Sequence, residues 1–187
     1  FGLVAIPEPA GRPFVIVTQE QEEAMAVGSR VAVMDEGRII QVSTPAAIYE
    51  YPNSVYVADF IGDVNIIEAT AKASGEEMYD LNWADGQPPI KATSTKPFTE
   101  GQQAHLAIRP EKIRIGRDRQ EGAFTAVGKI TEWAYYGDIS NVYVEIAGGQ
   151  RLSVVHQNET RERVNGMDIG DTVNIAWSAE DTILLTK

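Results

Sequence analysis

The first third of the chain alternates short apolar groups with polar turns. Phe14–Thr18 is a continuous apolar run, which is typical of a strand buried on both faces. Thr18 and Gln21 stand at the spacing of a capping box, a common start of a helix. The pattern therefore predicts a strand over residues 14–18, followed directly by a helix over residues 19–27 that ends near Gly28.

Two further apolar runs, Arg30–Met34 and Ile39–Val42, flank the polar turn Asp35–Arg38 and predict a β-hairpin. Thr44 and Pro45 then provide an N-cap followed by a proline at the first helical position, which predicts a short helix through residue 49. A second helix is expected from residues 52–53 to residue 62, where a glycine ends the helical spacing of apolar residues.

After Gly62 the pattern changes to short β-like segments separated by Gly, Asp and Asn. Residues 87–100, which are rich in Pro, Thr and Lys, are expected to form a surface loop. Many short strands at this spacing favour a small closed barrel. The fold class is therefore an α/β segment over residues 1–62 followed by an all-β, OB-like barrel over residues 63–187. The predicted strands are Asn65–Ala71, Gln103–Ile108, Phe124–Glu132, Asn141–Ile146, Arg151–Val155, Thr172–Trp177 and Thr182–Thr186.

Composition narrows the classes of function. The chain has 187 residues, of which 43% are hydrophobic, enough for a substantial core. Its 27 acidic and 16 basic side chains give a net charge of −11, which argues against nucleic-acid binding because phosphates are repelled. There is no cysteine, so disulfides and zinc–thiolate sites are excluded. No apolar run approaches the ~20 residues of a membrane-spanning helix, so we expect no direct insertion into a membrane.

Most polar clusters have a local explanation. Glu20, Glu22 and Glu23 lie in the first turn of the predicted helix, where the helix dipole favours acidic residues. His105 and His156 lie in different predicted strands and have no third ligand nearby in sequence. We therefore predict no metal site and no resident cofactor, and no nucleophile motif is present.

An ordered set of motifs resembles a known family. The early segments resemble the end of the ATPase domain of ABC importers of the maltose and polyamine type, and the later ones resemble the TOBE regulatory region of the same proteins. The motifs 63–65 and 136–138 are more similar to the putrescine/spermidine branch. The matching segments are Val17–Met25, Arg30–Ile39, Thr44–Tyr49, Phe60–Asn65, Ala107–Lys112, Tyr135–Asp138 and Gly170–Trp177.

This resemblance implies a degenerate C-terminal remnant of the ATPase domain over residues 1–62. Gln19 stands where the family has the switch histidine, and glutamine can neither carry a positive charge nor shuttle a proton. Glu8 stands weakly at the position of the Walker B glutamate, with Pro7 in place of the preceding Asp. The sequence contains no Gly-x-x-x-x-Gly-Lys-Ser/Thr loop, so we expect no ATP hydrolysis by this chain, and ATP and Mg²⁺ are implied only for the full-length family.

Candidate regulatory or interface residues lie in the β region. Arg109 and Glu111 flank a proline that ends a strand, and they serve either a structural role or a regulatory contact. Trp133, Tyr135, Tyr136 and Trp177 form either an aromatic face for a cation or part of a core or dimer contact, and Asp138 lies beside them.

The resemblance further implies an accessory, regulatory and dimerisation role in uptake of a polyamine or similar small solute. The partners implied are a second copy and permease subunits, at the cytoplasmic face of an inner membrane. Two alternatives stay open: a barrel of the molybdate-binding type that takes a small ligand or oxyanion, and a fragment of an active ATPase whose P-loop lies upstream.

Overall fold

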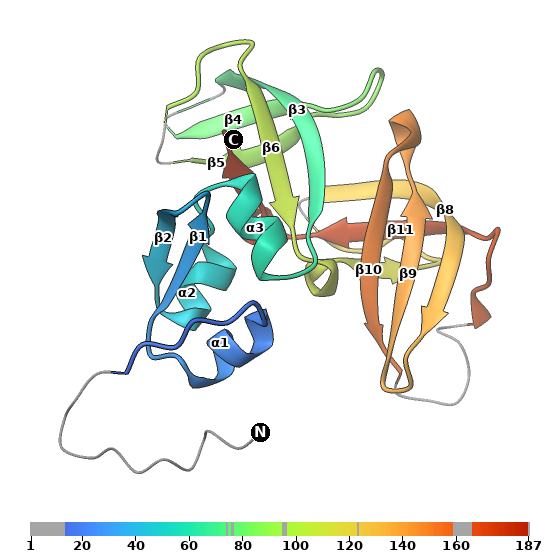
Figure 1. Ribbon diagram of the computed structural model, residues 1–187. Coiled ribbons are helices and arrows are strands. Elements are labelled where there is room, and N and C mark those ends of the chain that lie inside the picture. Colours follow the sequence, from blue (N-terminus) through green and yellow to red (C-terminus); the bar gives the residue numbers. More distant parts are fainter. Residues whose placement is uncertain are drawn as a thin grey trace. The chain divides into compact units, whose positions relative to one another are not determined.

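The computed structural model describes residues 14–73, 75, 77–94, 97–122, 124–158 and 166–186. The described chain divides into two compact units between Gly62 and Asp63. Figure 1 shows the first unit in blue and teal and the second from green to red. Each unit is described by itself below.

The first unit contains a hairpin of β1 (Val31–Asp35) and β2 (Arg38–Ser43), which pair antiparallel. The turn between them has positive φ at both central residues, 45° at Glu36 and 77° at Gly37, the geometry of a type I′ turn. This confirms the hairpin. Its small core contains buried residues of β1 and of the two helices that follow the hairpin, namely Val31, Val33, Ile48, Val57 and Ile61, and the partly buried Ile40 of β2 packs against them.

Two short helices complete this unit, and side-chain caps fix where both begin. In α2 (Pro45–Glu50) the Thr44 hydroxyl accepts a hydrogen bond from the Ala47 N–H at 3.3 Å, as the Thr-Pro pair predicts. In α3 (Val55–Ile61) the Ser54 hydroxyl accepts from the Val57 N–H at 3.3 Å. The helix therefore begins two residues later than predicted, and it ends at Gly62 as expected.

The predicted strand over residues 14–18 is wrong. These residues are mostly exposed, and no described segment pairs with them. A strand buried on both faces needs neighbouring backbone on both sides, which the described residues do not supply. Thr18 accepts a hydrogen bond from the Glu20 N–H at 2.9 Å instead of forming a capping box with Gln21, so α1 (Gln21–Val27) begins two residues late.

The second unit begins with one five-stranded antiparallel sheet. Its order is β12-β6-β3-β4-β5, and β12 also contacts β5, so the sheet curls round on itself. The short β5 lies inside the segment that was predicted to be a loop. The sequence signal for this strand is weak, because its apolar alternation consists of Ile90 and Ala92 alone. The strands are β3 (Asn65–Ala73), β4 (Met78–Asn82), β5 (Ile90–Thr93), β6 (Gln103–Ile108) and β12 (Ile183–Leu185).

A second five-stranded antiparallel sheet has the order β10-β9-β8-β11-β7, and β10 contacts β7. The all-β, OB-like prediction is confirmed, with two curled sheets where one barrel was expected. A single hydrophobic core contains residues of both sheets, so the second unit is one packed body. The strands are β7 (Arg114–Gly116), β8 (Phe124–Tyr135), β9 (Ile139–Glu145), β10 (Arg151–Gln157) and β11 (Thr172–Trp177).

The chain crosses between the two sheets through short 3₁₀ turns. After β6, η1 (Pro110–Lys112) leads to β7 in the second sheet, and after β11, η4 (Ala179–Asp181) returns to β12 in the first. A third turn, η2 (Ala147–Gly149), joins β9 to β10. The second sheet is therefore formed by the consecutive strands β7 to β11, whereas the first combines β3 to β6 with β12, which follows the second sheet in the chain (Figure 1).

One buried amide ties the sheets together. Asn65, at the start of β3, is only 6% exposed. Its Nδ2 donates to the Ser153 carbonyl at 2.8 Å, and its Oδ1 accepts from the Ser153 N–H at 2.7 Å. The side chain thus bonds to β10 as a neighbouring strand would, which gives the last residue of the motif Phe60–Asn65 a structural role.

Candidate interface of the second unit

The turn between β8 and β9 presents two exposed tyrosines. Tyr135 ends β8 and is 71% exposed, and Tyr136 follows it at 64%. The Tyr136 N–H donates to the Ile139 carbonyl at 2.9 Å, and Gly137 has φ of 96°, a backbone conformation that favours glycine. Large aromatic rings left in water on a tight turn are candidates for contact with a partner.

Asn158, which follows β10, holds this turn in place. Its Nδ2 donates to the Gly137 carbonyl at 2.9 Å, and its backbone N–H donates to the Asp138 carbonyl at 2.7 Å. Its Oδ1 accepts from the buried Ser140 hydroxyl at 2.9 Å. Three hydrogen bonds from one residue therefore fix the tyrosine turn, which we call the clamped turn (residues 135–138).

Of the two interpretations of the four aromatic residues, a face for a cation or part of a core or interface, Trp177 has the core role. Trp177, at the end of β11, is 1% exposed and packs on Phe124 with ring centroids 4.7 Å apart. Trp133 is half-buried against the same core. Only Tyr135 and Tyr136 are exposed, and Asp138 lies beside them on the clamped turn.

Arg109 and Glu111 lie at the first crossover. Arg109 is 3% exposed and donates from Nη1 to the Asp63 carbonyl at 3.0 Å, a contact inside the second unit. Glu111 is exposed within η1. The buried guanidinium thereby links the residue after β6 to the chain just after Gly62, which fits the structural role.

The outer face of β8, β9 and β10 carries a polar cluster that the sequence analysis missed. Arg151 forms an ion pair with Glu132, and its guanidinium lies 4.1 Å from the centroid of the Tyr143 ring. The cross-strand register brings these residues of three strands together. A β-bulge in β8 between Ile130 and Glu132 shifts that register, and no pattern in the sequence predicts this bulge.

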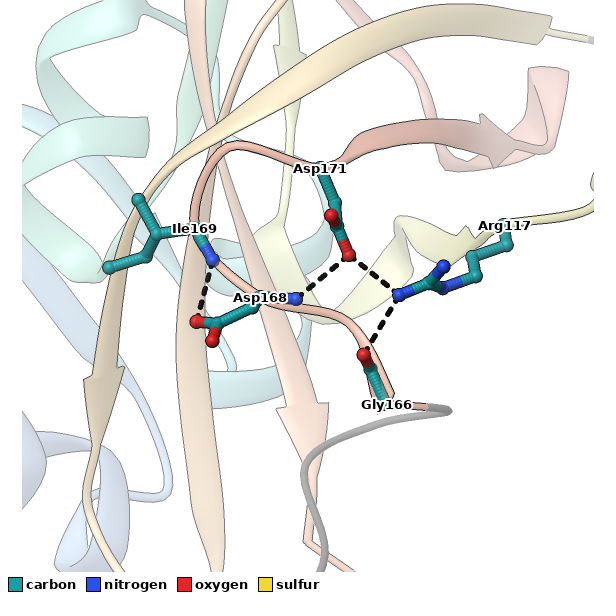
Figure 2. A network of polar contacts seen from close by, with 5 residues as sticks. All are labelled: Arg117, Gly166, Asp168, Ile169 and Asp171. Carbon is teal, nitrogen blue, oxygen red and sulfur yellow. Dashed lines mark hydrogen bonds and ion pairs between the residues drawn. The ribbon is translucent and has the colours of Figure 1, made fainter.

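A second network closes the loop that precedes β11 (Figure 2). Arg117 donates from Nη2 to the Asp171 carboxylate at 2.7 Å and to the Gly166 carbonyl at 2.8 Å. Asp171 also accepts from the Asp168 N–H at 3.0 Å, and Asp168 accepts from the Ile169 N–H at 2.8 Å. Both carboxylates thus accept hydrogen bonds from the loop itself or from Arg117, which fits a structural role for the network.

A shallow polar cleft of about 200 Å³ lies over β3, β6 and the end of β4. Glu68 and His105 face each other there as cross-strand partners, and the Trp83 indole donates to the Pro88 carbonyl at 3.1 Å. The buried His105 Nδ1 has no hydrogen-bond partner. The predicted absence of a histidine metal site stays a prediction; among the described residues no three His, Asp or Glu side chains gather to hold a metal ion.

Of the two site residues that the resemblance placed in the first unit, the structure describes only Gln19. Gln19 is exposed and precedes α1. Glu8 lies outside the described residues. In the part of the chain that the structure describes, no helix is both long and apolar enough to cross a membrane.

Comparison with known proteins agrees with the fold of the second unit. Residues 106–185 match the TOBE domain. A crystal structure of the cytoplasmic molybdate-binding protein ModG, with molybdate bound, superposes with a TM-score of 0.54 at 15% sequence identity. The match covers 64% of this chain and 94% of that one. At this identity the likeness concerns the fold alone.

Curated relatives match nearly the whole chain. The putrescine transport ATP-binding protein PotG of Escherichia coli is 35% identical, over 98% of this chain and 49% of its own. The spermidine/putrescine import ATP-binding proteins PotA of Pseudomonas aeruginosa and Chromobacterium violaceum are 37% and 33% identical, over 94% and 99% of this chain. These matches cover 48% and 52% of the two PotA chains, so the chain spans about half the length of the curated relatives it matches. The chain is therefore similar to about half of the ATP-binding proteins of putrescine and spermidine/putrescine import, and its residues 106–185 match the TOBE domain.

Proposed function

We propose that this chain is the accessory, regulatory and dimerisation portion of an ATP-binding subunit that drives uptake of a polyamine or similar small solute. The names of the relatives support the solute class, and the TOBE match supports the regulatory role. In this proposal two copies pair beneath permease subunits on the cytoplasmic face of the inner membrane, without inserting into the bilayer.

The clamped turn is the observation that carries the dimerisation proposal. Tyr135 and Tyr136 are exposed, and tyrosine is enriched at the centres of protein interfaces. Because Asn158 already fixes the turn, little conformational entropy is lost when a partner covers it. Asp138 and the half-buried Trp133 lie next to the tyrosines in sequence and would extend the contact.

We further propose that the chain does not hydrolyse ATP by itself. Its sequence lacks a P-loop, and Gln19 replaces the family's switch histidine. The first unit would instead complete an ATPase domain in a longer protein, where ATP and Mg²⁺ bind. The exposed apolar residues Phe14, Val15, Ile16 and Val17 support this proposal, because such a run is normally covered.

Two other functions have less support. An oxyanion-binding barrel is suggested only by the likeness to ModG, and the net charge of −11 disfavours an anion. An active ATPase with its P-loop upstream is compatible with the half-length match, and would still contain the second unit described here.

Light scattering over a concentration series tests the pairing. We expect a dimer that forms with rising concentration, and at least a tenfold weaker dimer when Tyr135→Ser and Tyr136→Ser are combined. Tyr51→Ser is the matched control, since Tyr51 is an equally exposed tyrosine of the first unit. A strict monomer at every concentration, or equal weakening by the control, would contradict the proposed interface.

Measuring phosphate release with Mg·ATP tests the proposal that the chain does not hydrolyse ATP by itself. We expect no release above the rate of buffer alone. Hydrolysis that rises in proportion to the concentration of purified chain would refute the proposal.

A further inference from the structure

The outer face of the first sheet of the second unit carries polar side chains on three adjacent strands. Along β3 buried residues alternate with outward-facing ones, and the start of β6 follows the same alternation. The cross-strand register places Glu68 of β3 opposite His105 of β6. Thr70 lies opposite Gln103 of β6 on one side and opposite Asn82 of β4 on the other. The register therefore gathers these five polar side chains, from strands far apart in sequence, on one surface.

The five side chains line the shallow polar cleft of about 200 Å³. The register pair Ala69 and Ala104, whose side chains are buried, lies between them and also lines the cleft. Trp83, the residue after β4, completes the lining, and its indole N–H is already engaged by the Pro88 carbonyl at 3.1 Å. What Trp83 can still offer a ligand is therefore the apolar surface of its ring.

The hydrogen-bonding capacity of the cleft is not used within the chain. Among the described residues, no hydrogen bond or ion pair engages any of the five polar side chains. Those that are exposed can bond to water, but Nδ1 of His105 is buried and has no partner. A buried imidazole nitrogen requires a partner in either tautomer, as a donor or as an acceptor. The cleft thus combines free polar groups at its surface with one unsatisfied polar atom in its wall.

We propose that this cleft binds a small neutral molecule rich in hydroxyl groups, of the size of one sugar ring. Hydroxyl groups both donate and accept hydrogen bonds, as do the amide, hydroxyl and imidazole side chains of the cleft. An ammonium group only donates, so it would leave the amide N–H groups of Asn82 and Gln103 without acceptors. An anion would meet the Glu68 carboxylate, and none of the described residues that line the cleft is a lysine or an arginine.

The dimensions of the cleft favour a single ring. Sites for drug-sized ligands typically have roughly 300–1,000 Å³, and this cleft is smaller. The Trp83 ring would cover the apolar face of a sugar, while the hydroxyls at the sugar's edge reach the polar side chains. A hydroxyl that donates to the Glu68 carboxylate forms a charge-assisted hydrogen bond, which is stronger than a bond to an amide. Glu68 should therefore contribute most to the affinity.

The proposal goes beyond the proposed function, because it concerns the second unit alone and requires neither a second copy nor ATP. Two-dimensional NMR of the ¹⁵N-labelled chain tests it. The chain contains three tryptophans and so gives three indole N–H signals, of which Trp83→Phe identifies the one that belongs to the cleft. Titration with D-glucose, D-galactose and D-mannose should shift this signal to saturation for at least one sugar, with a Kd on the order of 1 mM. The signals of Trp133 and Trp177, which do not line the cleft, should stay in place.

Variants locate the binding on the cleft. Glu68→Ala should raise the Kd at least tenfold, because it removes the charged acceptor. Glu145→Ala is the matched control, since Glu145 is an exposed glutamate of β9 in the other sheet, and it should leave the Kd unchanged. Should Glu68→Ala not fold, Asn82→Ala tests the same cleft at another exposed position, and there too the Kd should rise.

The absence of a saturable shift of the Trp83 signal with all three sugars up to about 50 mM would overturn the proposal. Equal weakening by Glu145→Ala would overturn it as well. Tighter binding of putrescine than of any of the sugars would identify an amine site instead, which also contradicts a hydroxyl-rich ligand. Each of these outcomes leaves the light-scattering and phosphate-release tests of the proposed function unaffected, so the two proposals fail separately.

Discussion

Replacing Asn65 with alanine should destabilise the second unit far more than its position at the start of a strand suggests. Its side chain makes two hydrogen bonds, at 2.8 and 2.7 Å, to the backbone of Ser153 in the other sheet. Each such bond contributes about 1 kcal/mol net. Because Asn65 is almost fully buried, its removal also leaves two partly desolvated backbone groups without partners.

Together these terms predict a loss of about 2–4 kcal/mol in the free energy of unfolding. For a chain of this length that corresponds to a fall of roughly 4–16 °C in Tm. Urea unfolding followed by circular dichroism measures the change directly. Ser153→Ala is the control, because both bonds use the backbone of Ser153, which alanine retains. If the free energies of unfolding of the two variants lie within about 0.5 kcal/mol of each other, the side-chain bonds of Asn65 do not stabilise the second unit.

Three further changes test other parts of the structure. Gly128→Ala should cost about 1–3 kcal/mol in chemical denaturation, since a Cβ there would clash with Val144 and lie 2.7 Å from the Glu145 carbonyl; an unchanged midpoint would show that the strands yield easily. Asn158→Ala should cost about 1–2 kcal/mol and speed hydrogen exchange in the clamped turn, whereas unaltered exchange would contradict the clamp. Desolvation and then the Asp35 carboxylate raise the pKa of Tyr56 above its usual value. The contribution of Tyr56 to stability is therefore present below pH ~10 and is lost as the pH rises through the raised pKa. Asp35→Asn should lower this pKa in a spectrophotometric titration, and an unchanged pKa would refute the coupling.

Local chemistry made much of the first unit predictable. The Thr44–Pro45 pair and the polar turn at residues 35–38 act through neighbours in sequence, and the structure forms both elements there. The apolar run at residues 14–18 carries an equally strong local signal, but a buried strand also requires partner strands. No described residues supply them, so the segment is extended and exposed.

The candidate interface was only partly predictable, because alternation along a strand does not say which face is buried. The bulge in β8 changes the register between Ile130 and Glu132, shortly before the tyrosines. The sequence pattern does not distinguish Trp177 from the two tyrosines, yet the Trp177 side chain, at the end of β11, lies in the core. The two crossovers through η1 and η4 share few residues, Ala107 and Glu111 matching Ala176 and Glu180, so the sequence does not reveal that they are alike.

Because β12 belongs to the first sheet, the residues that match the TOBE domain and the residues that fold as one unit have different limits. The TOBE match begins at residue 106, inside β6, and ends with β12 at residue 185. A polypeptide limited to that range would contain β12 and half of β6 but none of β3, β4 or β5, so its first sheet would lack its centre. A segment that carries both sheets complete therefore has to begin near Asp63, well before the first residue of the TOBE match.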